Sequence, residues 1–375
     1  MTNEDPQSPL VVLADSPHRR EILSLLRESK TPLTNATLTK RSSAGRKTVH
    51  TTLRKLGDND WIRKTAKRHN ELTVTGHLVL RAYECFCDRE NESVVLFLTR
   101  SPTRPGTLRY LSEHTHDQNT DQDQNRNQNR QTEYCRFVDI ADSLTGSRPT
   151  VSRCLDDCTA RGWLSKGGHG QYAVTAAGKR VVQSYETLED TVSWVTTNAA
   201  CINRFGSEHI EIGTNLPLVP LRNNVTAIKA EHADPDAPFL HYREQLTATQ
   251  PATLHGILPV ASLQAAITRG VLADANTDIE LIMDDAAIEA ARTSYPTQFA
   301  AVRADERITL LKHPSLLEIG LSLFDGTAVL GAYSNEDSHL HATLSSSAGL
   351  FTEYATHIYD EHYHRSTPLD QQQSV

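Results

Sequence analysis

The sequence predicts a multi-domain α+β protein in which two tandem units of helices and a β-hairpin precede a separate α/β domain. Two observations carry this prediction. In the N-terminal half, a stretch of about forty residues recurs after a shift of 102 residues. In the C-terminal half, short apolar runs alternate with amphipathic stretches. The length of 375 residues suits two or three domains.

The repeat aligns residues 43–84 with residues 145–186 without a gap. Identical residues meet at these pairs: Arg46 and Arg148, Trp61 and Trp163, Gly76 and Gly178, Tyr83 and Tyr185. Upstream the shift is smaller, because the second copy carries an insertion at residues 114–133, HTHDQNTDQDQNRNQNRQTE. The insertion has no apolar residue to bury, so we expect a disordered surface loop.

Each copy is expected to fold as three helices, a hairpin and a longer helix. In the first copy, Ser16 is a candidate N-cap before Pro17, and apolar residues recur at helical spacing behind it. A short helix over 33–40 and a third helix after Gly45 follow. Two apolar segments then flank the basic loop KTAKRHNE, and a long helix begins near Thr75. This order resembles the winged helix-turn-helix domain of archaeal and bacterial regulators.

Charge is distributed unevenly along the chain. The net charge is −8, but residues 16–84 hold 15 Lys or Arg against 6 Asp or Glu. Residues 206–375 hold 9 against 22. A basic N-terminal unit on an acidic body is expected when only one part of a protein contacts phosphates.

The third helix of the first unit is the candidate recognition helix. Val49, Leu53 and Leu56 form its docking face. Its polar residues can read base edges in the major groove of double-stranded DNA: Arg46, Lys47, Thr48, His50, Thr51, Arg54 and Lys55. The hairpin, or wing, adds cations placed to meet phosphates: Lys64, Lys67 and Arg68.

The second unit has a weaker set of candidates. They are Arg148, Ser152, Arg153 and, in the hairpin, Lys166. Asp156 and Asp157 stand where the first copy has Arg54 and Lys55, and carboxylates repel phosphate. Two interpretations stay open for this copy: a second DNA contact, or a spacer or dimer surface.

Six segments are expected. They are a disordered leader (1–15), the first winged unit (16–92), the second (93–180), a connecting helix (181–205), an α/β regulatory domain (206–366) and a tail (367–375). The connecting helix has an apolar stripe that either pairs with its twin in a homodimer, matching a palindromic operator, or packs on the C-terminal domain.

In the C-terminal domain we expect strands at 253–260, 278–283, 307–312, 317–324, 327–333 and 340–344. Helices are expected at 261–271, 284–295 and 347–364. Asp325-Gly326 between two apolar runs predicts a type I′ hairpin.

The basic N-terminal unit, together with the runs LHGILPV, DIELIMDD and ITLLKHPSLLEIGLSLFDGTAVLGAYS, resembles archaeal regulators of the methanogenesis-regulator type, which abound in halophiles. The resemblance covers residues 16–84 and about 206–365. It implies a helix-turn-helix regulator whose C-terminal domain senses a small-molecule effector or mediates dimerisation. The second winged unit is a departure from that pattern.

Other functions find less support. The closing hairpin is similar to the phospholipase D fold, but the domain has no HxK motif, only Lys312-His313, so we expect neither an enzyme nor a cofactor. A metal or redox sensor would use residues from this set: His339, His341, His357, His362, His364, Cys154 and Cys158. A winged helix that binds protein is the remaining alternative, though it needs no basic surface. Without a signal peptide or an apolar run of about 20 residues, the expected location is the cytoplasm, away from membranes.

Overall fold

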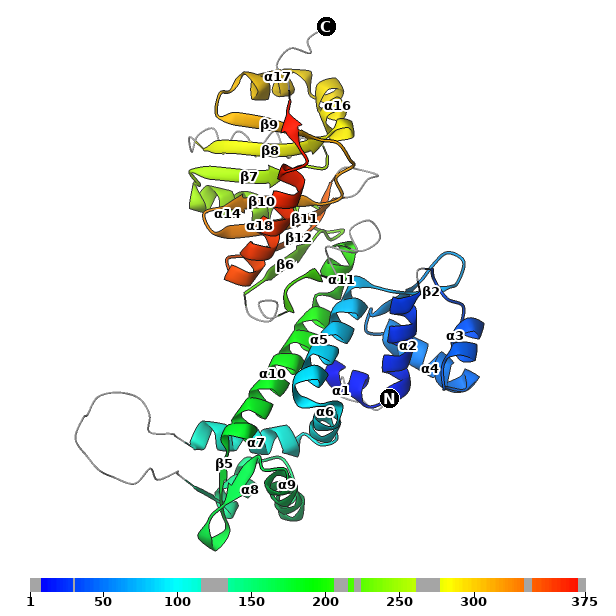
Figure 1. Ribbon diagram of the computed structural model, residues 1–375, viewed down its shortest axis with the longest axis vertical. Coiled ribbons are helices and arrows are strands. Elements are labelled where there is room, and N and C mark those ends of the chain that lie inside the picture. Colours follow the sequence, from blue (N-terminus) through cyan, green and yellow to red (C-terminus); the bar gives the residue numbers. More distant parts are fainter. Residues whose placement is uncertain are drawn as a thin grey trace, which may run out of the picture. The chain divides into compact units, whose positions relative to one another are not determined.

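The computed structural model describes residues 8–29, 31–115, 134–205, 215–218, 224–260, 277–333 and 339–369. The chain forms two compact units. The first comprises Met1–Leu56 and Val79–Ser193, and the second comprises Gly57–Leu78 and Trp194–Val375. The hairpin of the first repeat therefore belongs to the second unit, together with the large C-terminal sheet. Figure 1 labels the helices and strands of both units.

The first unit begins with helices α1 (Pro9–Ala14), α2 (Pro17–Glu28), α3 (Asn35–Arg41) and α4 (Arg46–Gly57). Ser16 stands at the N-cap of α2 as expected, although its side chain makes no capping hydrogen bond. The docking residues of α4, Val49, Leu53 and Leu56, are buried. The leader was expected to be disordered through residue 15, and this is wrong for α1, because its apolar residues Leu10 and Leu13 are buried.

Strands β1 (Ile62–Lys64) and β2 (Asn70–Leu72) form the first hairpin and lead into α5 (Val74–Glu90). The strands are antiparallel, with Lys64 opposite Asn70. Within the second unit, Asn203 ties both ends of this segment. Its amide oxygen accepts from the backbone N–H of Thr75 (2.9 Å), and its amide nitrogen donates to the carbonyl of Asp60 (3.1 Å).

The second repeat lies within the first unit. After α6 (Glu92–Thr99) come α7 (Thr103–His114), β3 (Cys135–Arg136), α8 (Phe137–Ser143), α9 (Arg148–Ala160), β4 (Leu164–Lys166), the 3-10 turn η1 (Gly168–Gly170), β5 (Gln171–Val174) and α10 (Ala176–Thr197). The strands form an antiparallel sheet in the order β3-β5-β4. Helix α9 packs on α7, α8 and β4. Most of the expected disordered insertion, from residue 116 to 133, lies outside the described residues.

The turn from hairpin to helix is the same in both repeats. In the first, the backbone N–H of Thr73 donates to the carbonyl of Trp61 (3.1 Å), and the Thr73 hydroxyl donates to the carbonyl of Asp60 (2.7 Å). A Cβ on Gly76 would overlap the same Trp61 carbonyl. Only glycine therefore lets the chain pass this close.

The second repeat reproduces each contact. The N–H of Thr175 donates to the Trp163 carbonyl (2.9 Å), and its hydroxyl donates to the Gly162 carbonyl (2.8 Å). A Cβ on Gly178 would overlap the Trp163 carbonyl. The sequence repeat is therefore a repeat of backbone geometry.

Helix α10 differs from the expected connecting helix. It ends at Thr197, and α11 (Ala199–Ile202) and the 3-10 turn η2 (Asn203–Phe205) follow, so the single helix expected over 181–205 is wrong. Asn198 interrupts it and donates a side-chain hydrogen bond to the Trp194 carbonyl (2.9 Å). The apolar stripe of the helix is buried within the single chain: Val181, Val182, Tyr185, Leu188, Val192 and Val195. The stripe is therefore not a free dimerisation surface.

The C-terminal domain is built on an eight-stranded mixed sheet in the order β13-β9-β8-β7-β10-β11-β12-β6. Its strands are β6 (Thr226–Lys229), β7 (Thr253–Ile257), β8 (Asp278–Asp284), β9 (Ile308–His313), β10 (Gly320–Phe324), β11 (Thr327–Tyr333), β12 (Leu340–Ser346) and β13 (Thr367–Pro368). Its helices are α14 (Ala237–Thr249), α16 (Asp285–Ser294), α17 (Pro296–Ala304) and α18 (Gly349–Tyr363). Strands β7, β8 and β9 are parallel neighbours, and the other pairs are antiparallel.

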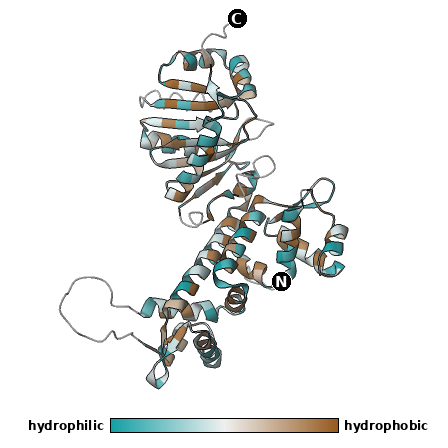
Figure 2. Ribbon diagram, viewed as in Figure 1, coloured by the Kyte–Doolittle hydropathy of each residue, from teal (hydrophilic) through white to brown (hydrophobic). Residues whose placement is uncertain are grey.

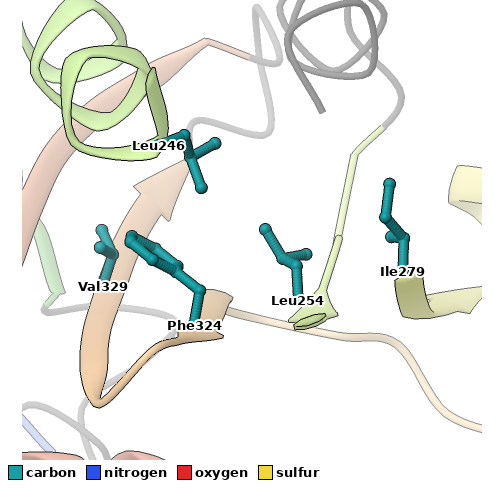
Figure 3. Packing of buried hydrophobic residues seen from close by; sticks show 5 residues of the cluster. All are labelled: Leu246, Leu254, Ile279, Phe324 and Val329. Carbon is teal, nitrogen blue, oxygen red and sulfur yellow. The ribbon is translucent and has the colours of Figure 1, made fainter. Parts of the chain in front are cut away.

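Helices cover both faces of this sheet. Successive side chains of a strand point to opposite faces, so Ile279 lies on one face of β8 and Glu280 on the other. On the Ile279 face, Leu246 of α14 packs against Leu254, Phe324 and Val329 (Figure 3). On the Glu280 face lies α18, whose Phe351 and Ala355 are fully buried. Figure 2 shows hydrophobic residues along the strands, with some hydrophilic ones among them.

Most expected elements of this domain are confirmed with shifted ends. Asp325 and Gly326 both have positive φ (43° and 73°), as a type I′ hairpin requires. Elements β6, α14, α17 and β13 were not expected. Strand β13 pairs Thr367 with Lys312, so the expected tail begins inside the sheet. The helix expected over 261–271 lies outside the described residues.

Candidate nucleic-acid interface

The polar side of α4 carries two parallel stripes. Residues four apart lie above one another on a helix. Arg46, His50 and Arg54 therefore form one stripe, and Lys47, Thr51 and Lys55 form the next. All are exposed except Lys55, which is half-buried, and Thr48 beside them is also exposed. The buried docking face holds this polar side outward.

The start of α4 is fixed by α2. Glu21 accepts hydrogen bonds from the backbone N–H of Ser43 (2.6 Å) and from the Ser43 hydroxyl (2.7 Å), and His18 lies 3.3 Å from the same carboxylate. Burial raises the pKa of Glu21, but the hydrogen bonds from Ser43 and the neighbouring His18 outweigh burial and leave it lowered. A charged carboxylate therefore positions the turn that precedes the basic helix.

In the described part of the chain, no carboxylate lies within 4.0 Å of the charged groups of Arg46, Lys47 or Arg54. Their charges are not compensated by ion pairs there. The same holds for the hairpin cations Lys64, Lys67 and Arg68, all of which are exposed. Arg63 instead pairs with Glu71.

The hairpin loop has a defined shape. The N–H of Thr65 donates to the carbonyl of His69 (2.9 Å), and the N–H of Arg68 donates back to the carbonyl of Thr65 (2.8 Å). Arg68 adopts a left-handed conformation, φ 58°, at the tip. Two exposed cations, Lys67 and Arg68, are thus adjacent on a turn closed by backbone hydrogen bonds.

In the second repeat, carboxylates pair with the corresponding cations. Arg148 lies 3.1 Å from Asp142, and Lys166 lies 4.0 Å from Asp156. Arg153 is exposed and Ser152 is half-buried. Asp157 lies 3.7 Å from Arg104 of α7. The aspartates that replace Arg54 and Lys55 thus reduce the positive field of α9 in addition to removing two charges.

Helices α2 and α4 also meet at a pocket of about 310 Å³, which the sequence alone did not predict. It is lined by Ser16, Arg19, Lys47, Thr48, Thr51, Thr52 and Lys55. Arg19 is only 6% exposed, its guanidinium donates to the carbonyl of Val12, and burial lowers its pKa. The sequence could have indicated this burial, because Arg19 lies three and four residues before Ile22 and Leu23 and therefore on the apolar face of α2.

The candidate residues for metal or redox sensing do not form a metal site in the described part of the chain. Among the described residues, no three His, Cys, Asp or Glu side chains form a group that could hold a metal ion. Cys154 and Cys158 are both buried in α9. The hydrogen bond between the two thiols lowers the pKa of Cys154, and the same bond, with burial, raises that of Cys158.

A polar cluster lies beneath α18 in the C-terminal domain, and its members were mostly missed from sequence. Glu280 accepts from the Tyr359 hydroxyl (2.5 Å) and lies 3.2 Å from His255. Nearby along α18, His362 lies 3.3 Å from buried His313. The alternation of polar and apolar residues within one strand does not reveal this cluster, because its members come from four different elements.

We expect the stability of the folded protein to depend on pH because of the contact between His313 and His362. Burial lowers the pKa of His362 from 6.5, with His313 and Arg365 acting in the same direction and Glu361 opposing them. The unfolded chain then binds more protons, so stability is complete above pH 6.5 and is lost as the pH falls through the folded pKa. Thermal melts between about pH 5 and pH 8 should show a weaker pH dependence for His362→Gln than for wild type. The matched control is His364→Gln, an exposed histidine. Equal slopes for all three proteins would contradict the assignment.

No helix in the described segments is both long and apolar enough to cross a membrane.

Two helix-and-hairpin repeats followed by a mixed eight-stranded domain define a multi-domain α+β protein with a basic helix exposed on its first repeat. Residues 8–94 and 128–196 match the family model HVO_A0261 N-terminal domain, and residues 235–365 match the middle domain of methanogenesis regulatory protein FilR1. The N-terminal region and the C-terminal domain belong to these two domain families, which confirms the resemblance to archaeal regulators. The first model spans both repeats, so the second repeat is part of the region that it matches.

Solved structures give weaker likenesses. TrmBL2, an archaeal chromatin protein, aligns over 77% of this chain and 99% of its own, with 10% identity and a TM-score of 0.30. NucT from Helicobacter pylori aligns over 39% of this chain and 98% of its own, with 9% identity and a TM-score of 0.32. The phospholipase D family member Nuc from Salmonella typhimurium gives the same coverage and identity, with a TM-score of 0.31. No curated protein matches the sequence.

Proposed function

We propose that this protein is a sequence-specific, DNA-binding transcriptional regulator and not an enzyme. Helix α4 is the recognition helix of a winged helix-turn-helix unit and enters the major groove, and the β1–β2 loop contacts phosphates. The C-terminal domain senses an effector or mediates dimerisation. The family name of that domain, a methanogenesis regulatory protein, supports a regulatory role.

The observation that carries the proposal is the uncompensated charge of α4. Arg46, Lys47 and Arg54 are exposed, and in the described part of the chain they have no carboxylate at ion-pair distance. Solvated basic helices are common, but this one is docked through its opposite face, and the hairpin that follows it in the sequence is also basic. Arginine is the side chain best suited to guanine edges.

The second repeat has a subordinate role in this proposal. Its cations Arg148 and Lys166 are compensated by Asp142 and Asp156. We infer that it does not read DNA and serves as a spacer or a dimer surface. A homodimer on a palindromic operator remains part of the proposal, but its contact uses a surface other than the buried stripe of α10.

Arg46→Ala and Arg54→Ala are each expected to weaken operator binding by about 1–3 kcal/mol, because each removes a side chain that contacts a base edge. The operator is first selected from random duplexes with the wild-type protein, and affinities are measured by fluorescence anisotropy. The control is Arg292→Ala, an exposed arginine of α16 that makes the same charge change far along the chain. Wild-type affinity for both test variants would contradict the assignment of α4.

A further inference from the structure

The pocket between α2 and α4 has the composition of an anion site. Three cationic side chains line it, Arg19, Lys47 and Lys55, together with the hydroxyl-bearing residues Ser16, Thr48, Thr51 and Thr52. Among the described residues, the Arg19 guanidinium has one carboxylate at ion-pair distance, that of Asp15, which lies 3.7 Å away and is itself 59% exposed. The pocket therefore keeps a net positive charge.

Arg19 makes this a preformed site. Long cations on a surface sample many rotamers, whereas this guanidinium is held by the Val12 carbonyl and is almost fully buried. The neighbouring Arg20 is held similarly, with hydrogen bonds to the carbonyls of Leu13 (3.1 Å) and Ala14 (2.9 Å). The C-terminal end of α1 thus positions the charge on one wall of the pocket.

The pocket also divides the polar side of α4. Its lining includes the whole Lys47–Thr51–Lys55 stripe and none of the Arg46–His50–Arg54 stripe. Side chains that border a pocket between two helices are oriented toward that pocket. The other stripe lies farther round the helix and is free to reach into a groove.

The chemistry of the pocket fits a phosphodiester better than a base edge. A phosphodiester carries a full negative charge and acceptor oxygens, and cations with hydroxyl groups satisfy both. Base edges are uncharged and lie on the floor of a groove, where a concavity between two helices does not reach.

We propose that this pocket is a backbone anchor, which holds one phosphate of the DNA strand beside the recognition helix and so fixes the position of the Arg46–His50–Arg54 stripe against the bases. The proposal rests on the proposed function. It divides α4 into an anchoring stripe and a reading stripe, and it gives Lys47, Thr51 and Lys55 a role that carries no sequence information.

The test uses the full chain, the selected operator and an unrelated duplex. Lys47→Gln should lower affinity for both duplexes by the same factor and reduce the slope of log K against log salt by about 0.9, the value for one phosphate. Arg46→Gln, on the same helix, should lower affinity for the operator alone. Lys47 is exposed, and thermal melts will show whether each variant folds as wild type does.

Methylphosphonate substitution identifies the phosphate itself. Each backbone position of the operator is replaced in turn by a neutral methylphosphonate. At one position per half-site the loss in affinity should not add to the loss caused by Lys47→Gln, because both remove the same contact. Additive losses at every position, or a change in base preference with Lys47→Gln, would overturn the anchor while leaving the proposed function intact. A wild-type protein that binds no duplex would overturn both.

Competition with inorganic phosphate distinguishes a DNA phosphate from a free phosphate ion as the occupant of the pocket. At constant ionic strength, phosphate should compete with DNA only weakly, because a tethered backbone phosphate is held by many other contacts. If phosphate alters operator binding of wild type strongly and of Lys47→Gln hardly at all, the pocket holds a free anion and the anchor is refuted.

Discussion

Replacing Gly178 by alanine is expected to lower the free energy of unfolding of the second repeat by about 3 kcal/mol. The new Cβ would overlap the carbonyl of Trp163, and the side chain of Val174 closes the other side. The carbonyl also accepts the N–H of Thr175, so moving it breaks the hydrogen bond that joins hairpin to helix. Neither neighbour is the flexible end of a long side chain, so relief requires a backbone shift. Thermal unfolding followed by circular dichroism measures the loss.

Gly168→Ala is the matched control. This glycine lies in the loop between β4 and β5 of the same repeat, and an added Cβ there meets nothing within 4 Å. Its free energy of unfolding should stay within about 0.5 kcal/mol of that of wild type. Equal stabilities of the two variants would show that the backbone at Gly178 has more room than the structure gives it. Gly76→Ala should act in the same way on the first hairpin, because its Cβ would meet the Trp61 carbonyl.

The second large effect is expected in the salt dependence of DNA binding. Neutralising the hairpin cations of the first repeat, with Lys64→Gln, Lys67→Gln and Arg68→Gln together, should flatten the slope of log K against log salt by about 2.7 if each cation contacts a phosphate. All three side chains are exposed. Binding titrations should run from low to molar salt, because at about 1 M the Debye length is only about 3 Å and long-range attraction fades.

The matched set lies in the second repeat: Arg148→Gln, Arg153→Gln and Lys166→Gln. It removes the same charge, but Arg148 and Lys166 are already paired with Asp142 and Asp156. We therefore expect it to change the slope by less than about 1. If it flattens the slope as much as the first set, both repeats contact DNA, and the second is not a spacer.

Sequence periodicity was sufficient for elements whose apolar residues form a regular stripe. Helix α4 was located closely because its buried residues follow a period of 3.6, and strand β11 because it is a short apolar run that directly follows the Asp325-Gly326 turn. Helix α14 is an exception, because it was missed although Phe239, Tyr242 and Leu246 lie at helical spacing and pack inward. Helix α17 buries only Phe299, so nothing in its pattern distinguishes it from a loop.

The candidate interface was predictable only where charge and spacing are local. The polar face of α4 follows from residues within three turns of one helix. The pocket does not, because it depends on how α2 packs against α4, and Arg19 lies 28 positions before Lys47. The pairing of Arg148 with Asp142 joins α9 to the helix before it, and no pattern within α9 reveals it.

Comparing the two copies of the hairpin-to-helix turn within this chain shows which residues the backbone geometry requires. The glycine, tryptophan and threonine of that turn are the same in both copies, and each has a steric or hydrogen-bonding reason to be there. Positions 54 and 55 differ completely from their counterparts 156 and 157. Because the same backbone contacts form in both copies, the surface residues of the two copies can differ. One copy can lose its cations while the other keeps them, without a loss of stability in either. Exchanging surface residues between the copies is therefore a route to moving DNA recognition along the chain without redesigning its core.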